Sequence, residues 1–310
     1  MERPEFGVLY SRFFPIVLPG EFASTAQALG FDSVWVSDGP SSRRAALDPV
    51  VCMASMAHCA DRIRIGSSVI LVPIRNPAIL AKEIASLDVV SGGRIVFGIG
   101  VGVSGMSDRG AYRATSTDPR ERGARCDEYL EVMTTLWTGS ADRYRGRFFE
   151  FDDIEMSPRP VQRPHPPIWA GGDAHGMLRR TARACQGFVP VATGPERYAE
   201  RWRHIERYAA QLGRDPLDIT RALHLYYRGA DTRTEARALA ERSLSERSGR
   251  DVEVIDDGRF ALGDAEACAE TIAAYREVGV EHFVINLACP ASDVPAQVER
   301  FAHDVLPRFR

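Results

Sequence analysis

Short hydrophobic segments recur along this chain and alternate with longer stretches that have helical periodicity. Nearly every position within a segment is apolar, which is typical of parallel strands buried on both faces of a sheet. The segments are Phe6–Tyr10, Ser33–Val36, Ile63–Val72, Arg94–Ile99, Pro167–Ala170, Gly187–Val191, Ala222–Tyr227 and His282–Leu287. Eight buried strands separated by helices predict an α/β fold, specifically a (β/α)8 TIM barrel.

The expected helices have recognisable ends. Asp48-Pro49 and Asn76-Pro77 each place a capping side chain before a proline in the first turn. Ser91-Gly92-Gly93 ends the second of these helices with a glycine suited to a left-handed C-cap. Later helices are expected over Ala174–Cys185, Pro195–Leu212, Thr234–Glu246, Ala265–Val278 and Val294–Phe309.

Two segments depart from a minimal barrel. Residues 103–166 form an insertion at the C-terminal face of the strands, with an expected helix over Glu121–Trp137 and a hairpin over Arg143–Met156. The segment Arg247–Leu262 is charged and interrupted by glycine, which predicts a loop over the mouth of the barrel. Because no repeat or linker divides the chain, we expect a single domain over residues 1–310.

The composition favours a function on small molecules. With 310 residues and a net charge of -3, the chain can bury a large core but has no basic field to attract nucleic acid or a membrane surface. No apolar run approaches the length of a membrane span. The six cysteines lack the spacing of a zinc site or a disulfide framework, so we expect reduced thiols, no metal and a cytoplasmic location.

The active site of a TIM barrel lies at the carboxyl ends of its strands. Here these ends are rich in glycine and small residues and poor in acids and histidines. They read Tyr10-Ser11-Arg12, Ser37-Asp38-Gly39, Ser67-Ser68, Gly100-Val101-Gly102, Gly171-Gly172, Ala192-Thr193-Gly194, Arg228 and Asn286. Asp38 alone does not make the carboxylate pair of a glycosidase, and no His-x-His pair indicates a metal hydrolase. The pattern favours a bound cofactor that carries the chemistry itself.

Glycines at three places predict contacts with such a cofactor. Alternate glycines from Gly98 to Gly102 leave bare backbone at a strand end, where either a flat ring lies or glycine only permits close packing. They do not open a helix, which disfavours a dinucleotide-binding turn. Gly171-Gly172 and Thr193-Gly194 each precede a helix whose free amides attract phosphate, and either pair is also compatible with an ordinary loop.

Several motifs keep a common order along the chain. They are GFDSVWVSDG (Gly30–Gly39), the segment Arg62–Gly102, RGARCDEYLEVMTTLWTG (Arg122–Gly139), FFEFDDIEMSPRPVQRPHPPIWAGG (Phe148–Gly172) and VGVEHFVINL (Val278–Leu287). In these motifs the chain resembles the bacterial-luciferase-like superfamily, and within it the branch of oxidoreductases that depend on the deazaflavin coenzyme F420. The similarity covers most of the chain.

This resemblance implies a position for the cofactor. The tricyclic ring is expected near Ser68-Val69, a peptide that in the family bulges and is often a non-proline cis bond. By the same resemblance Asp38 lies beside the edge of the ring, and Gly100, Val101 and Gly102 line its face or the ribityl chain. The phosphate is expected at Gly171, Gly172, Thr193 and Gly194.

The sequence departs from the family pattern at Gly39, where many F420-dependent relatives have histidine. A proton donor or substrate contact expected there is missing. The resemblance therefore leaves catalysis to Asp38, Arg12 or Asn286, or to hydride transfer that needs no acid from the protein.

The function expected from these observations is that of an oxidoreductase that transfers a hydride between coenzyme F420 and a small organic substrate. The alternatives are a reduced-FMN-dependent monooxygenase and a flavin-binding protein without catalysis. Because relatives are often dimers, we also expect a homo-oligomer. The helix that carries Leu80, Ile84 and Leu87 either serves such an interface or covers the strands.

Overall fold

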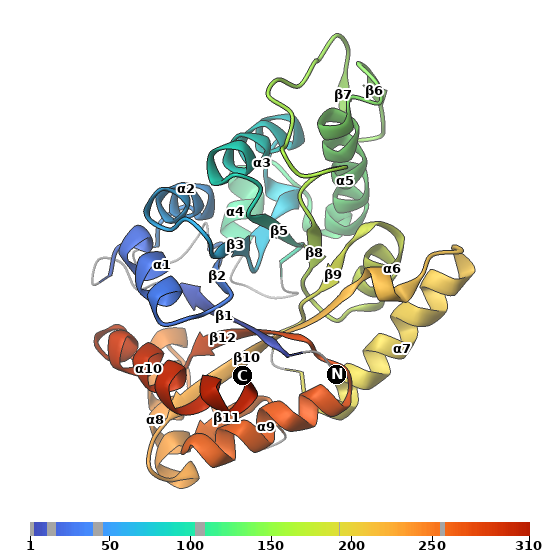
Figure 1. Ribbon diagram of the computed structural model, residues 1–310. Helices are drawn as coiled ribbons and strands as arrows, with labels where there is room; N and C mark the ends of the chain where they lie inside the picture. Colours follow the sequence, from blue (N-terminus) through green and yellow to red (C-terminus); the bar gives the residue numbers. More distant parts are fainter. Residues whose placement is uncertain (1–2, 11–16, 40–45, 103–108, 192, 255–257) are drawn as a thin grey trace.

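A computed structural model describes residues 3–10, 17–39, 46–102, 109–191, 193–254 and 258–310. Its centre is a closed ring of eight parallel strands surrounded by helices (Figure 1). In ring order these strands are β10 (Thr220–Gly229), β12 (His282–Leu287), β1 (Glu5–Tyr10), β2 (Ser33–Val36), β3 (Arg64–Ser67), β5 (Ile95–Gly100), β8 (Ile168–Ala170) and β9 (Gly187–Phe188), which pairs again with β10. The predicted TIM barrel is confirmed.

The third predicted strand, Ile63–Val72, is interrupted in the structure. β3 ends at Ser67, and the two-residue strand β4 (Ile70–Leu71) resumes the pairing with β5. A short 3₁₀ turn over Val72–Ile74 follows. The break falls at Ser68 and Val69, so the chain leaves the barrel wall for two residues at its carboxyl end.

Helices form the outer layer of the described structure. They are α1 (Pro19–Ala28), α2 (Pro49–Cys59), α3 (Pro77–Ser91), α4 (Arg109–Ala114), α5 (Arg122–Thr138), α6 (His175–Ala184), α7 (Pro195–Gln211), α8 (Arg233–Ser248), α9 (Ala265–Glu277) and α10 (Val294–Arg300). A π-helical turn, Phe301–Val305, and 3₁₀ turns at Pro119–Glu121, Pro216–Asp218, Ala291–Asp293 and Leu306–Phe309 complete the helical segments.

The predicted helix caps are confirmed. The Asp48 carboxylate accepts a hydrogen bond from the amide of Val50, and the Asn76 side chain accepts from Ala78 and Ile79. Gly92 ends α3 in the left-handed conformation, with φ of 69°. Local sequence therefore sets these helix ends, because each cap satisfies backbone groups that the helix itself leaves unpaired.

α3 covers the strands. Leu80, Ile84 and Leu87 are 1%, 0% and 5% exposed and belong to the main core between helices and sheet. Their burial within one chain leaves no area for a partner, so of the two possibilities raised by the sequence only the covering role holds for these residues.

The segment between β5 and β8 contributes a regular helix to the barrel. α5 packs on the strands through Trp137, whose ring meets Phe97 edge to face at 5.9 Å and whose Nε1 donates to the carbonyl of Ala81. Beyond α5 the predicted hairpin is present as β6 (Tyr144–Arg145) and β7 (Glu150–Phe151), which projects from the barrel (Figure 1). Glu128 of α5 accepts hydrogen bonds from the amides at the tip of the hairpin and so fixes it to the helix.

The segment Arg247–Leu262 is not entirely a loop. Its first two residues continue α8, and Phe260 begins a further strand, β11 (Phe260–Gly263). β11 pairs in parallel with the last four residues of β10, whereas the first two residues of β10 pair with β9. The prediction of a loop is therefore wrong at both ends, and the reason is a strand pairing that local composition does not reveal.

Two tryptophans fill the lower part of the barrel interior, toward the amino ends of the strands. Trp35 and Trp169 lie 5.0 Å apart between ring centroids, within an interior cluster that also holds Leu9, Val96 and Val284. Glycines on neighbouring strands make room for them. A Cβ added at Gly7 or Gly66 would lie under 3 Å from Trp35, and one at Gly187 would lie 2.5 Å from Trp169.

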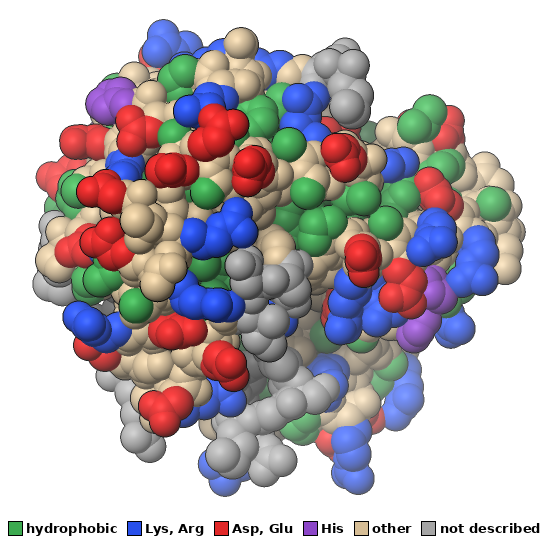
Figure 2. Space-filling view, turned by 90° about the horizontal axis from the view of Figure 1, so that it is seen from below, with side chains coloured by type: hydrophobic (Ala, Val, Ile, Leu, Met, Phe, Trp, Pro, Cys, Tyr) green, Lys and Arg blue, Asp and Glu red, His purple; other side chains and the backbone are tan. Residues whose placement is uncertain are grey.

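Charges of both signs cover the face seen in Figure 2, where acidic and basic side chains alternate and no broad region of one sign is visible. Within the described residues, no helix combines the length and the hydrophobicity needed to cross a bilayer.

The interior packing predicts a specific weakness. Gly66→Ala places a methyl group 2.3 Å from the Trp35 ring, so we expect a loss of about 1–3 kcal/mol in the free energy of unfolding. Gly176→Ala is the control, because nothing lies within 4 Å of the added Cβ and the residue is in α6. That variant should gain up to about 1 kcal/mol. Urea unfolding of both variants tests this, and equal stabilities would contradict the packing argument.

Candidate active site

The carboxyl ends of the barrel strands bring together most of the predicted site residues. Ser68 and Val69 lie between β3 and β4, Gly100 ends β5, and Gly171 follows β8. Asn286 is on β12, and Thr193 and Gly194 precede α7. Arg12, predicted as a catalytic residue, lies outside the described residues.

The peptide between Ser68 and Val69 is cis, as the family resemblance implies. The Val69 side chain lies between two glycines of adjacent strands. A Cβ added at Gly100 would be 2.4 Å from one Val69 methyl, and a Cβ at Gly171 would be 2.6 Å from the other. At Gly98 a Cβ would be 1.6 Å from the carbonyl oxygen of Ser67. Close packing therefore explains Gly98 and Gly100. The Val69 side chain covers the face of Gly100 where the sequence predicted exposed backbone.

Gly172 is different from these packed glycines. It has a φ of 96°, which L side chains rarely adopt, and nothing lies within 4 Å of where a Cβ would stand. Gly102, just after β5, also has a positive φ of 72°. At both positions backbone conformation requires glycine, and at Gly172 the backbone faces open space.

Asp38 is held inside the protein. Its side chain is only 2% exposed and lies 3.1 Å from a guanidinium nitrogen of Arg75 and 3.1 Å from the amide of Leu71. Arg75 also pairs with Asp48 at 2.9 Å. Burial opposes the charged form of Arg75, but the two carboxylates raise its pKa above the usual value. Asp38 therefore ties the end of β2 to the β4 segment, and its carboxylate is engaged in the protein.

Two polar groups on adjacent strands are buried above the tryptophan layer. Asn286 is 5% exposed, and within the described residues its Oδ1 has no hydrogen-bond partner. His224 on β10 is 4% exposed, and its Nε2 likewise has no partner there, whereas its Nδ1 lies 3.4 Å from Ser68 Oγ. Unpaired buried polar atoms are costly and uncommon, so they indicate a place where a further group binds.

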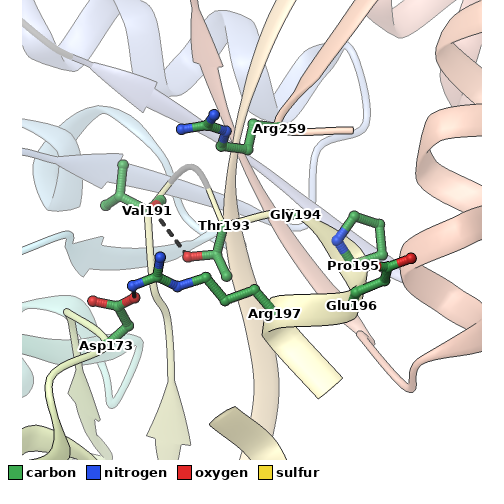
Figure 3. Close-up of a pocket in the computed structure, with 8 residues that line it drawn as sticks. All are labelled: Asp173, Val191, Thr193, Gly194, Pro195, Glu196, Arg197 and Arg259. Atoms are coloured by element: carbon green, nitrogen blue, oxygen red, sulfur yellow. Dashed lines mark hydrogen bonds and ion pairs between the residues drawn. The ribbon is translucent and has the colours of Figure 1, made fainter. Parts of the chain in front are cut away.

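A cavity of about 620 Å³ opens at the start of α7 (Figure 3). Its lining is Asp173, Val191, Thr193, Gly194, Pro195, Glu196, Arg197 and Arg259. The first amides of a helix have no partner within it, so this end of α7 favours an anion.

Charged side chains surround this cavity unevenly. Arg197 reaches across it to the Asp173 carboxylate at 2.6 Å, and Arg259 faces Thr193 from the opposite side (Figure 3). Glu196 points away from the Asp173–Arg197 pair. An anion in the cavity thus lies near the guanidinium groups of Arg259 and of Arg197, and Arg197 is also paired with Asp173.

Tyr275 of α9 joins two segments of the cavity wall. Its hydroxyl lies 2.6 Å from the carbonyl oxygen of Thr193 and 2.8 Å from that of Gly258. Gly258 in turn packs on Pro195 at the start of α7, and the next residue is Arg259. The strand β11 and the buried Tyr275 therefore determine where Arg259 stands.

Sequence reasoning missed several residues of this site, among them Arg197, Arg259 and His224. Arg259 lay in a segment interpreted as loop, and only a short apolar run before Gly263-Asp264 indicated β11. His224 lay inside a correctly predicted strand, but the pattern of that strand, apolar on both faces, did not indicate which side chains face the interior.

The chain belongs to the luciferase-like monooxygenase family, whose sequence profile matches residues 19–254. It is an oxidoreductase of this family, dependent either on F420 or on a flavin. This membership gives no support to the alternative of a flavin-binding protein without catalysis.

Individual relatives illustrate both cofactors. The chain is 26% identical to an F420-dependent glucose-6-phosphate dehydrogenase of Amycolatopsis mediterranei, over 94% of this chain and 93% of that protein. Its fold matches an F420-dependent secondary alcohol dehydrogenase with a TM-score of 0.83 and 21% identity, covering 100% of both chains. It also matches the oxygenating constituent of 3,6-diketocamphane monooxygenase from Pseudomonas putida in complex with FMN, with a TM-score of 0.77, 20% identity and 99% coverage of both chains.

The buried ion pair predicts a loss of stability on substitution of Asp38. The sequence alone suggests that Asp38→Ala weakens cofactor binding and leaves the fold intact. Because Asp38→Ala also removes the contacts with Leu71 and Arg75, we expect the free energy of unfolding to fall by about 1–3 kcal/mol. The loss stays in this range because Arg75 remains paired with Asp48.

Asp38→Asn keeps an acceptor for the Leu71 amide and should lose less. Asp142→Ala is the control, because Asp142 is 64% exposed and pairs with the exposed Arg143, so its effect should stay within about 0.5 kcal/mol. Chemical unfolding of the three variants without cofactor decides the matter. If Asp38→Ala unfolds like the control, the ion pair does not stabilise the site.

Proposed function

We propose that this protein transfers a hydride between coenzyme F420 and a small organic substrate. The observation that carries the choice of F420 is the similarity to F420-dependent glucose-6-phosphate dehydrogenase along 94% of the chain. Two features of the structure support the proposal independently of cofactor type: two buried polar atoms without a partner in the described residues, and a cavity at the start of α7 that suits an anion.

The residues fit a deazaflavin or flavin cofactor in two respects. The unpaired Nε2 of His224 and Oδ1 of Asn286 are buried atoms that need partners, and a tricyclic ring with a polar edge provides them. The cavity at α7, with Thr193 and the two arginines, suits a phosphate. When bound, F420 supplies the ring carbon that accepts or gives up the hydride.

Each predicted site residue then has a proposed task. Ser68, Val69, Val101 and Gly102 support the ring and its ribityl chain, and Gly100 contributes by leaving room for the Val69 side chain. Gly171, Gly172, Thr193 and Gly194 hold the phosphate through backbone amides and the Thr193 hydroxyl. The barrel and its loops orient the substrate and exclude water.

The catalytic assignments follow from how each group is placed. Asp38, which is paired with Arg75, acts by positioning the Ser68-Val69 segment. Asn286 offers a buried acceptor to the substrate or the ring. Arg12, which lies outside the described residues, stays a proposed catalytic residue on the sequence alone. With Gly39 where many relatives have histidine, hydride transfer proceeds without an acid at that position.

A reduced-FMN-dependent monooxygenase is the alternative, supported by the fold match to an enzyme that binds FMN. The two activities differ in their need for oxygen, because a deazaflavin lacks the ring nitrogen that helps to form an oxygen adduct. Oxygen uptake with reduced FMN and a panel of substrates would favour the alternative.

The decisive experiment is a titration of cofactor-free protein with F420 and with FMN under matched conditions, followed by fluorescence. We expect tighter binding of F420. Turnover is then measured with glucose-6-phosphate and with secondary alcohols, the substrates of two similar F420-dependent dehydrogenases. Tighter binding of FMN, or turnover that requires oxygen, would overturn the proposal in favour of the monooxygenase.

Three further expectations remain proposals. They are a single domain with an insertion near residues 103–166, a homo-oligomer, and a cytoplasmic location. The oligomeric state is measured by light scattering coupled to size-exclusion chromatography, and a monomer at all concentrations would contradict it.

The proposed phosphate site predicts a selective loss of affinity. Arg259→Ala removes a guanidinium from the cavity, so we expect binding of FMN to weaken about tenfold or more, as for one charge-assisted hydrogen bond. Riboflavin, which has the same ring and no phosphate, should bind with unchanged affinity. Arg62→Ala is the control, because that side chain is 79% exposed and does not belong to the cavity lining. An equal loss for FMN and riboflavin would place the phosphate elsewhere.

A further inference from the structure

His224 faces the interior of the barrel. On β10 the side chains of Leu223, Leu225 and Tyr227 pack into the main core between sheet and helices. Ala222 belongs instead to the interior cluster around the two tryptophans. Because side chains alternate along a strand, His224 stands on the inner face, one step above this cluster.

Asn286 occupies the corresponding place on the neighbouring strand. Val284 of β12 belongs to the interior cluster, whereas Ile285 and Leu287 pack outward. β10 and β12 are paired so that His224 lies opposite Val284 and Tyr226 opposite Asn286. His224 and Asn286 are therefore inward-facing neighbours, offset by one step along adjacent strands.

The imidazole of His224 is neutral. Burial, together with the charge of Arg247, lowers the pKa of His224 to about 3. A neutral imidazole has one donating and one accepting nitrogen. The hydroxyl of Ser68 lies 3.4 Å from Nδ1. If this hydroxyl donates to Nδ1, the proton of the ring is on Nε2, the atom without a partner in the described residues.

The two unpaired atoms then have opposite functions. Nε2 of His224 offers a donor, and Oδ1 of Asn286 offers an acceptor. The pyrimidine edge of a flavin presents carbonyl oxygens next to an N–H group, and the deazaflavin ring has the same edge. A donor and an acceptor on the inner faces of adjacent strands match this edge, whichever of the two cofactors is bound.

We propose that His224, positioned by Ser68, binds the pyrimidine edge of the cofactor ring through Nε2, with Asn286 accepting from the same edge. This inference rests on the proposed binding of a tricyclic ring but not on the choice between F420 and FMN. It gives Ser68 a second task beside its place in the cis peptide, because its hydroxyl sets the orientation and the tautomer of the imidazole.

Ring and phosphate contributions are separated by using two ligands. FMN and riboflavin are titrated against wild type, His224→Leu, His224→Gln and His58→Ala, and F420 is titrated in parallel. His58 is an exposed residue of α2 and serves as the matched histidine control. The absorbance spectrum of the bound ring is recorded with each variant, since a hydrogen bond at the pyrimidine edge shifts it.

We expect His224→Leu to weaken FMN, riboflavin and F420 by the same factor, about three- to tenfold, which corresponds to one neutral hydrogen bond. The spectrum of the bound ring should shift. His224→Gln, which keeps a donor, should recover part of the affinity, and His58→Ala should bind like wild type. Without cofactor, His224→Leu should melt close to wild type, because the lost contact with Ser68 is offset by the removal of the unpartnered Nε2.

Other results would overturn the inference. Unchanged affinity and an unchanged spectrum in His224→Leu would show that Nε2 does not contact the ring. A loss seen with FMN but not with riboflavin would place His224 at the phosphate. A lower melting temperature without cofactor, with no recovery in His224→Gln, would show a packing role only.

Failure of the proposed function is distinguishable from these results. If wild type binds FMN and not F420, the choice of F420 fails while the role of His224 is still measured with FMN and riboflavin. If wild type binds none of the three ligands, both proposals fail.

Discussion

The rest of this structure depends on how the barrel interior is filled. Eight strands enclose a space that side chains must occupy at the density of a protein core. Trp35 and Trp169 occupy its lower part, and Gly7, Gly66 and Gly187 leave the room that their rings require. This layer closes the barrel from below. The buried His282 at the amino end of β12 contacts both rings, and His224 and Asn286 stand on the carboxyl side of the layer.

Above this layer, packing and charge together fix the wall of the site. Val69 fits between Gly100 and Gly171, so three neighbouring strand ends hold one another in place. The buried ion pair between Asp38 and Arg75 holds the same segment to the end of β2. A cofactor bound here would meet a surface that is already ordered, which reduces the entropy lost on binding.

The cavity at α7 has a different origin, because it is assembled from segments far apart in the chain. The turn after β9 supplies Thr193, α7 supplies its free amides and Arg197, and the residue before β11 supplies Arg259. Tyr275 contacts two of these segments at once. Such an arrangement suits an oxidoreductase whose protein part binds and orients while a cofactor performs the chemistry.

The sequence by itself determined the barrel, its helix caps and its family, because each depends on local patterns or on motifs that keep their order. Continuous apolar segments predict buried parallel strands, and Asp48-Pro49 or Asn76-Pro77 cap a helix through contacts within three residues. Only the tertiary structure decided which partner Asp38 has, that Phe260–Gly263 is a strand and that His224 faces inward. Each of these depends on pairing between residues distant in sequence. In strands that are apolar on both faces, no periodicity marks the inner side, so the direction of His224 follows only from closure of the barrel.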